Sequence, residues 1–282
     1  MQPRSTITKV LGLLAGVLLA FFPLLSPAPV YADSLEIPGT GACEVLLGAL
    51  AAAFNAGHPG HRVMVPPTIG SSGGIRLVAR DQAILARVSQ PLKEKEKADG
   101  LQYLVFARDM VVFAGGAKVT VKNLTRAQLL DAYAGKITDW QELGGKPGPI
   151  RLLLRQPGDS NLLIIHEHLP AFRNISFSPS AKVVHTDPKM LEMLLKYHYS
   201  LGGLTFSALK GVHPPLHPLS LDGIAPTPEN ARSHKYPLIC DYALVFKEER
   251  LHDLARSFID FIFSKTAQNV MEQYGVMPVD KE

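Results

Sequence analysis

Residues 63–88 read Val63-Met-Val-Pro-Pro-Thr-Ile-Gly-Ser-Ser-Gly-Gly-Ile-Arg-Leu-Val-Ala-Arg-Asp-Gln-Ala-Ile-Leu-Ala-Arg-Val88. The apolar runs Val63–Val65 and Ala83–Val88 predict strands, and the periodicity of Gly73–Asp81 predicts a helix between them. The glycines and serines of residues 70–74 supply the turn that opens this helix. A strand, a helix and a second strand in succession form a βαβ unit, which is typical of an α/β fold with a largely parallel sheet.

The same alternation continues toward both ends of the chain. Further predicted strands are Leu35–Ile37, Arg108–Ala114, Ile150–Leu154 and Pro237–Phe246. Predicted helices are Glu44–Phe54, a helix N-capped by Thr125 with Gln128 three residues later, Asp187–Tyr197, and a long region His252–Tyr274 that one helix or two can occupy. The charged run Lys93–Lys97 is expected on the solvated surface.

Length and composition exclude several classes of protein. With 46% hydrophobic and 19% charged residues, the 282-residue chain is neither a disordered tail nor a coiled coil. Two cysteines are too few for a disulfide-stapled mini-protein. Because a typical domain has about 100–150 residues, this length favours two lobes.

Residues 1–32 have the layout of a secretory signal peptide. Arg4 and Lys9 precede an apolar run from Val10 to Leu25, and small residues lead to a cleavage site after Ala32. The alternative is an uncleaved membrane anchor, but the run is shorter than the ~20 residues that span a bilayer. Cleavage lowers the net charge from +4 to +2, which does not favour nucleic acid as a partner.

Cys43 and Cys240 allow two interpretations. In an oxidising compartment they can form a disulfide that closes a long loop. They can equally be two small buried apolar side chains.

Three turns rich in glycine and hydroxyl residues lie between a predicted strand and a predicted helix. They are Pro38–Ala42, Gly70–Gly74 and Arg155–Asn161. A helix start presents unpaired N–H groups and partial positive charge, and glycine lets an oxyanion approach the backbone. Three such turns at one sheet edge predict a site for one tetrahedral anion, with Arg155 as its fixed charge. For any single turn, ordinary helix capping explains the same residues.

Motifs along nearly all of residues 35–280 carry a family resemblance. They are Gly70–Arg76, Ala86–Lys93, Phe106–Val112, Asn123–Trp140, Leu143–Gly145, Arg155 with Gly158, Leu201–Phe206, Tyr236–Leu238, Phe258–Phe263, Gln268 and Tyr274-Gly275. In these motifs the chain resembles the periplasmic phosphate-binding proteins of ABC transporters, within the type II periplasmic solute-binding protein superfamily. The stretch Gly135-Lys-Ile-Thr-Asp-Trp140 is the most specific of them.

The resemblance implies a two-lobed α/β fold. Each lobe is expected to be a mixed, mostly parallel sheet flanked by helices, and two crossing strands near Gly115 and Pro237 join the lobes. Residues 33–115 and 239–282 would form the first lobe, and residues 116–238 the second. The lobes would close on the anion by a hinge motion.

The resemblance also implies ligand-binding residues, namely Thr40, Gly41, Ser71, Ser72, Gly73 and Arg155. The third turn adds the candidates Gly158, Asp159, Ser160 and Asn161. The third turn departs from the family pattern Arg-x-x-Gly-Ser-Gly-Thr, because Asp159, Ser160 and Asn161 follow Gly158. Asp159 allows two interpretations. It can accept a proton from monohydrogen phosphate and so discriminate against sulfate, or it can cap its helix and point away.

The expected function is an exported binding protein that captures phosphate or a related tetrahedral oxyanion and delivers it to an inner-membrane ABC permease. It is expected to be a periplasmic monomer without catalytic residues, metal or cofactor. One alternative is a sensor or adhesion module with a degenerate pocket. Another is a serine hydrolase, because Gly70–Gly74 matches G-x-S-x-G with Ser72 as nucleophile.

Overall fold

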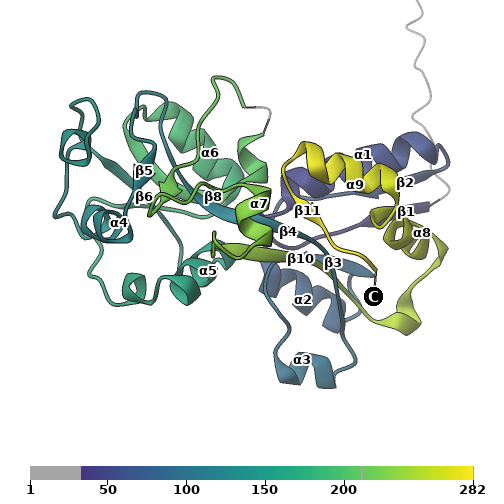
Figure 1. Ribbon diagram of the computed structural model, residues 1–282. Helices are drawn as coiled ribbons and strands as arrows, with labels where there is room; N and C mark the ends of the chain where they lie inside the picture. Colours follow the sequence, from purple (N-terminus) through teal and green to yellow (C-terminus); the bar gives the residue numbers. More distant parts are fainter. Residues whose placement is uncertain (1–32, 211, 282) are drawn as a thin grey trace, which may run out of the picture. The chain divides into compact units, whose positions relative to one another are not determined.

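The computed structural model describes residues 33–210 and 212–281 (Figure 1). The signal peptide predicted for residues 1–32 lies outside the described residues. The strands are β1 (Asp33–Glu36), β2 (His61–Met64), β3 (Leu85–Val88), β4 (Gln102–Gly115), β5 (Asn123–Leu124), β6 (Arg151–Arg155), β7 (Lys182–Val184), β8 (Ser200–Thr205), β9 (Ser220–Leu221), β10 (Ile239–Phe246) and β11 (Met277–Pro278). The helices are α1 (Glu44–Gly57), α2 (Ser71–Ala79), α3 (Glu94–Ala98), α4 (Arg126–Tyr133), α5 (Ser160–His168), α6 (Asp187–Lys196), α7 (Pro228–Arg232), α8 (Asp253–Ile262) and α9 (Lys265–Gln273).

These elements confirm the predicted α/β alternation. Thr125 caps α4 by accepting a hydrogen bond from Gln128 N, and the Gln128 side chain accepts one from Thr125 N at 2.9 Å. The C-terminal helical region is two helices, because Ser264 begins α9 as an N-cap. The charged run near Lys93 forms the short helix α3.

The largest sheet has seven strands in the order β3-β10-β4-β8-β6-β7, with β11 also paired to β4. The expectation of a mostly parallel sheet is wrong for this sheet. Its pairs β10–β3, β10–β4, β11–β4 and β4–β8 are antiparallel, and β6–β8 and β6–β7 are parallel. The two separate pairs β1–β2 and β5–β9 are parallel. The sheet is mixed because its central strands β4 and β10 run in opposite directions.

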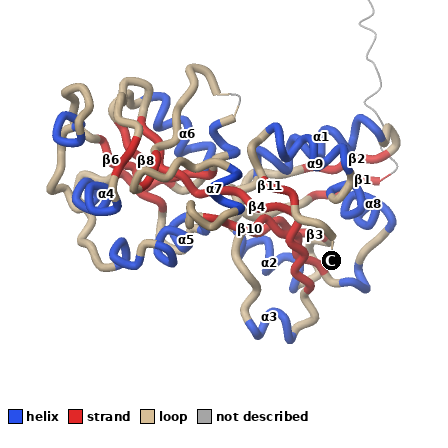
Figure 2. Tube along the Cα trace, viewed as in Figure 1, coloured by secondary structure: helices blue, strands red, loops and turns tan. Residues whose placement is uncertain are grey.

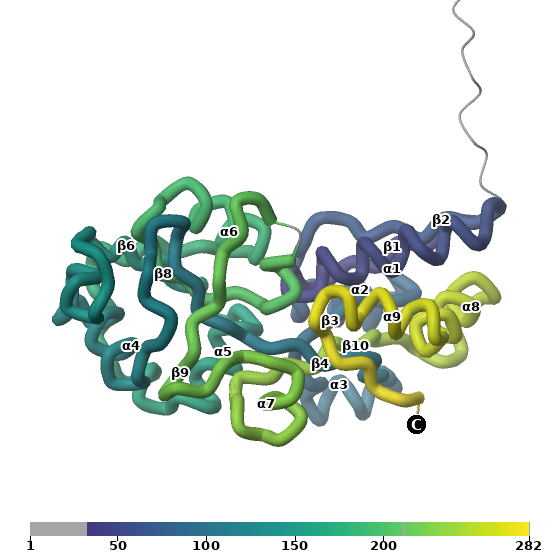
Figure 3. Tube along the Cα trace, turned by 45° about the horizontal axis from the view of Figure 1, so that its top comes forward, coloured from purple at the N-terminus to yellow at the C-terminus, as the bar shows by residue number. Residues whose placement is uncertain are grey.

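Strand β4 joins two groups of strands. Its first part pairs with β10, and its last five residues pair with β8 instead. The segment before β10 stays beside β4 at this change of partner, because Val111 N donates to Leu238 O at 2.8 Å and Tyr236 Oη donates to Val111 O at 2.8 Å. The two chain segments therefore run together through the middle of the sheet (Figure 3).

Helices lie along the strands (Figure 2), and most of the residues that they bury are apolar. Helix α1 packs on β2, α8 and α9, where the Phe54 ring meets the edges of Phe258 and Phe261. Helix α2 packs on β3 and β10 around a smaller buried cluster that includes Ile75 and Val245. Within the described residues, no helix is long and apolar enough to cross a membrane.

Cys43 and Cys240 are both free and fully buried, which corresponds to the second interpretation of this pair. Burial raises the pKa of the Cys43 thiol to about 12, and that of Cys240 rises for the same reason. Both thiols are therefore protonated and unreactive in the folded protein.

Asp109 on β4 is a fully buried carboxyl group beside the start of α1. Its Oδ1 accepts from Met110 N, and its Oδ2 lies 3.2 Å from Ser207 N and 2.7 Å from the Tyr242 hydroxyl. That hydroxyl also lies 2.8 Å from the Ala42 carbonyl oxygen and has one proton for two acceptors. Protonation of Asp109 supplies the missing proton. The carboxyl group then donates to Tyr242 Oη, and the Tyr242 hydroxyl donates to the Ala42 carbonyl oxygen.

We expect Asp109 to make stability fall as the pH rises between about 4 and 6. Burial raises its pKa from 3.8 to about 6, and hydrogen bonding with Ser207 and Tyr242, which favours the charged form, partly opposes this. Across that window the folded chain binds more protons than the unfolded chain, so the unfolding free energy decreases with pH. The contribution of Asp109 to the unfolding free energy is fully present below pH 4, and it is about 3 kcal/mol smaller above pH 6.

Urea unfolding of the wild type and of Asp109→Asn between pH 4 and 7.5 measures this dependence. The difference between the two proteins should change with pH only in the stated window. Asp241→Asn is the matched control, because Asp241 is exposed on β10 and pairs with Arg108 at 3.0 Å. Wild-type and Asp109→Asn profiles that run parallel would contradict the prediction.

Candidate functional site

The first turn, between β1 and α1, is held against β3. Thr40 N donates to Arg87 O at 3.0 Å, and the Thr40 hydroxyl lies 3.1 Å from Ser89 Oγ. Gly39 has a φ of +145°, and a Cβ atom there would lie 1.8 Å from Arg87 O. Only glycine permits this approach of two backbones. The turn thus places the buried Thr40 and Gly41 at the carboxyl end of β3.

The second turn begins α2. Gly70 has a φ of +76°, and Ser71 is the first helical residue. The buried Ser71 hydroxyl accepts from Ser89 N at 3.2 Å and lies 3.1 Å from Ser160 Oγ at the start of α5. This contact joins the second turn to the third across 89 residues of sequence.

The three turns surround one cavity of about 200 Å³. Seven residues expected to bind a ligand line it, namely Thr40, Gly41, Ser71, Arg155, Gly158, Asp159 and Ser160. Ser72, Gly73 and Asn161 are not among its lining residues. Ser72 is the second residue of α2 and is exposed, and Asn161 points its amide at Asp187 Oδ1, 2.9 Å away.

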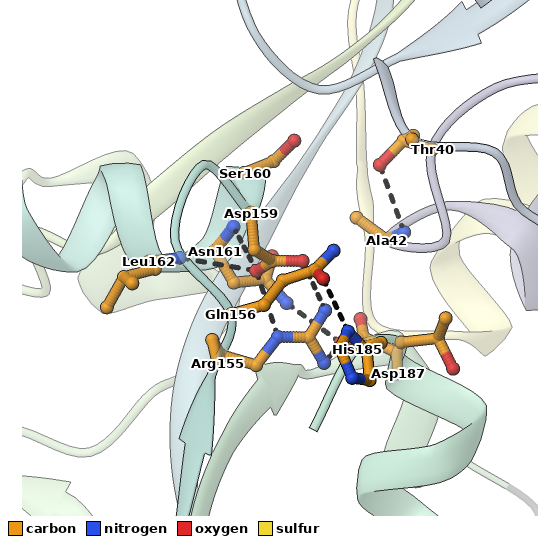
Figure 4. A network of polar contacts seen from close by, with 12 residues as sticks. Thr40, Ala42, Arg155, Gln156, Asp159, Ser160, Asn161, Leu162, His185 and Asp187 are labelled. Carbon is orange, nitrogen blue, oxygen red and sulfur yellow. Dashed lines mark hydrogen bonds and ion pairs between the residues drawn. The ribbon is translucent and has the colours of Figure 1, made fainter. Parts of the chain in front are cut away.

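Arg155, at the end of β6, is almost completely buried and faces two carboxylates (Figure 4). Its Nε and Nη2 lie 2.9 and 2.5 Å from the two oxygens of Asp159. Its Nη1 lies 2.8 Å from Asp187 Oδ1, but without the direction of a hydrogen bond, so Nη1 has no hydrogen-bond partner among the described residues. Arg155 therefore lines the cavity while its charge is shared between two carboxylates, and its Nη1 is buried on the side of Asp187.

Asp159 has two partners. It is the N-cap of α5, accepting from Asn161 N at 3.0 Å and Leu162 N at 3.4 Å, and it also forms the ion pair with Arg155. Helix capping is therefore confirmed. Asp159 is nevertheless one of the residues that line the cavity.

Asp187, the first residue of α6, is completely buried behind Arg155. Its Oδ2 accepts from the Thr205 hydroxyl at 2.9 Å, and that hydroxyl also lies 3.2 Å from Ala42 O. Burial raises the pKa of Asp187, and the Arg155 guanidinium opposes this shift. Burial lowers the pKa of Arg155, but Asp187 and Asp159 together raise it by more, so the guanidinium stays charged.

A fourth turn, which was not predicted from the sequence, also lines the cavity. It follows β7, and its residues His185 and Thr186 precede α6. Because β6 and β7 are parallel neighbours, their carboxyl ends meet at one sheet edge. Thr186 accepts a hydrogen bond from Lys189 N as an N-cap, and this capping pattern was the signal available in the sequence. Thr68, Ile69, Gly70 and Gln156 complete the lining.

The arrangement does not favour a serine hydrolase. The hydrogen bond made by Ser72 Oγ comes from the Gln90 amide at 3.2 Å. Among the described residues, no histidine lies within hydrogen-bond distance of this hydroxyl, so it has no general base.

Sequence comparisons identify relatives along most of the chain. It is 25% identical to "Phosphate-binding protein PstS" of Borreliella burgdorferi over 217 residues, which are 74% of this chain and 77% of the relative. It is 25% identical to the Bacillus subtilis protein of the same name over 251 residues, which are 87% of this chain and 81% of the relative.

Solved structures share the fold. A Clostridium perfringens protein described as a phosphate ABC transporter substrate-binding protein, with phosphate bound, matches with a TM-score of 0.76 and 28% identity. The match covers 88% of this chain and all of that one. An ABC-type phosphate transport receptor from Vibrio cholerae matches with a TM-score of 0.63 and 24% identity over 87% of this chain and all of that one. A family model described as a PBP superfamily domain matches residues 26–266, and the chain therefore belongs to the PBP superfamily.

Proposed function

We propose that this protein is the substrate-binding protein of an ABC transporter and captures phosphate, or a related tetrahedral oxyanion, in the cavity between the four turns. The observation that carries the proposal is that Arg155 and the hydroxyl-bearing residues Thr40, Ser71 and Ser160 meet on one cavity at the starts of helices. Thr40, Ser71 and Ser160 would add neutral donors. The names of the relatives agree with this chemistry.

The division into two lobes belongs to the proposal. We place the first lobe at residues 33–115 with 239–282 and the second at residues 116–238. Strand β4 and residues 236–246 would be the crossing segments, since β4 changes partners at Val111. The Ser71–Ser160 and Thr205–Ala42 contacts would then join the lobes in the closed state. Export to the periplasm as a monomer and delivery to an inner-membrane permease complete the proposal.

Phosphate should raise the melting temperature of the purified protein. A ligand at 100 times its dissociation constant stabilises the folded state by about 2.7 kcal/mol, which corresponds to a shift of roughly 5–10 °C for a chain of this size. A thermal-shift panel with phosphate, sulfate, molybdate and tungstate measures this, and calorimetric titration gives the affinities. No shift with any of these anions would contradict transport and favour a sensor or adhesion module.

Asp159→Ser tests ligand selection in the same assay. Sulfate carries no proton to donate, so a carboxylate in the cavity repels it more than it repels monohydrogen phosphate. The variant should therefore lose part of the phosphate preference over sulfate. An unchanged preference would remove the discriminating role of Asp159 and leave it as a helix cap and a partner of Arg155.

A further inference from the structure

His185 occupies the turn between β7 and α6 and lines the cavity. Its Nδ1 forms a short hydrogen bond with Gln156 Oε1, shown as a dashed line in Figure 4. An amide oxygen accepts, so Nδ1 carries a proton in this contact. Nε2 is then the nitrogen at which the ring gains its second proton and its charge.

The charges around the cavity make this histidine important. The lining contains one permanent cation, Arg155, and one carboxylate, Asp159, and these two pair with each other. Asp187 adds a second carboxyl group directly behind the guanidinium. The described lining side chains and Asp187 therefore provide no net positive formal charge beyond the partial charges of the helix starts, and His185 is the one other described lining residue that can become a cation.

We propose that His185 is a ligand-binding residue whose imidazolium form supplies the positive charge that the Arg155–Asp159 pair does not. This inference rests on the proposed anion-binding function of the same cavity. The contribution of His185 to anion affinity is then present only in the protonated form of its ring, so it grows on acidification.

Charged groups lie on each element next to His185 in the chain or in the sheet. Arg155 and Asp159 come from β6 and the start of α5, and Lys182 comes from β7. Asp187 comes from α6, on which Lys189 is paired with Glu192 at 2.7 Å. The first and second turns contribute Thr40, Gly41 and residues 68–71, none of which titrates in this range.

Calorimetric titration with inorganic phosphate at pH 5.5 and pH 8.5 tests the proposal on the wild type, His185→Gln and His185→Lys. The ratio of variant to wild-type dissociation constants at one pH cancels the protonation of phosphate itself. For His185→Gln we expect a ratio near one at pH 8.5 that rises to roughly tenfold at pH 5.5, because a charged hydrogen bond is lost. His185→Lys keeps a charge at both pH values and should bind more tightly than the wild type at pH 8.5.

His217→Gln is the matched control, because His217 is exposed and lines a different cavity beside residues 115–122. Its ratio should stay near one at both pH values. A ratio for His185→Gln that does not change with pH, in a variant with wild-type melting temperature, overturns the role of His185. A wild type that binds no phosphate at either pH overturns the proposed function, and this inference with it.

Discussion

Arg155→Met is expected to abolish measurable phosphate binding and to lower the unfolding free energy by about 3–5 kcal/mol. The guanidinium is almost completely buried between Asp159 and Asp187, and the Asp187 side chain has no exposed surface. Removing the cation leaves an uncompensated buried carboxylate, which is the costly way to break such a pair. Calorimetric titration and urea unfolding of the same preparation measure the two effects.

A second substitution separates the two effects of Arg155→Met. Arg155→Met combined with Asp187→Asn removes the unpaired buried charge and should recover much of the lost stability, whereas phosphate binding should stay absent. Arg155→Lys keeps the charge but lacks the two-point contact with Asp159, so intermediate binding is expected. Phosphate binding that survives Arg155→Met would show that the hydroxyl and backbone donors hold the anion alone.

Arg87→Leu is expected to lower the unfolding free energy by about 3–5 kcal/mol and to weaken phosphate binding, although Arg87 does not line the cavity. Its fully buried guanidinium donates to the carbonyl oxygens of Ile37, Thr40 and Pro66 and pairs with Glu44 at 3.2 Å. Leucine has no N–H group in its side chain, so it leaves these carbonyl groups buried without donors. The first turn would lose the contacts that place Thr40.

Arg108→Leu is the control for Arg87→Leu. Arg108 lies on β4 beside β10, half exposed, and its pair with Asp241 is a surface ion pair. Such pairs contribute less than about 1 kcal/mol, so this variant should unfold nearly like the wild type. Burial also lowers the pKa of Arg87. An equal loss of stability in Arg87→Leu and Arg108→Leu would show that the buried contacts of Arg87 contribute no more than those of a surface arginine.

Local patterns were sufficient for most elements of the fold. The capping pair Thr125 and Gln128, the apolar periodicity of α1 and the glycine turn before α2 each depend on residues close in sequence. The direction of strand pairing was not predictable in this way. Whether β4 meets β10 and β8 in antiparallel order depends on how distant segments pass each other, since Val111 pairs with Thr205 and Gln102 pairs with Phe246.

Much of the site was predictable from the sequence, because three of its turns carry the glycine and hydroxyl residues that begin a helix. Seven of the ten expected ligand residues line one cavity, because the strands before the turns end near one another. His185 and Asp187 were missed, since a histidine in a loop and an aspartate at a helix start are common in any sequence. Their importance comes from β7 lying beside β6, which brings them to Arg155.

The amino-acid sequence by itself determined the α/β class, the three anion-type turns and the presence of one strong cation in them, because capping, glycine conformation and periodicity act over a few residues. Only the tertiary structure decided the charge balance of the cavity. It places Asp159 and Asp187 on the guanidinium of Arg155 and His185 at the rim, and the energy of a charge depends on its neighbours in space.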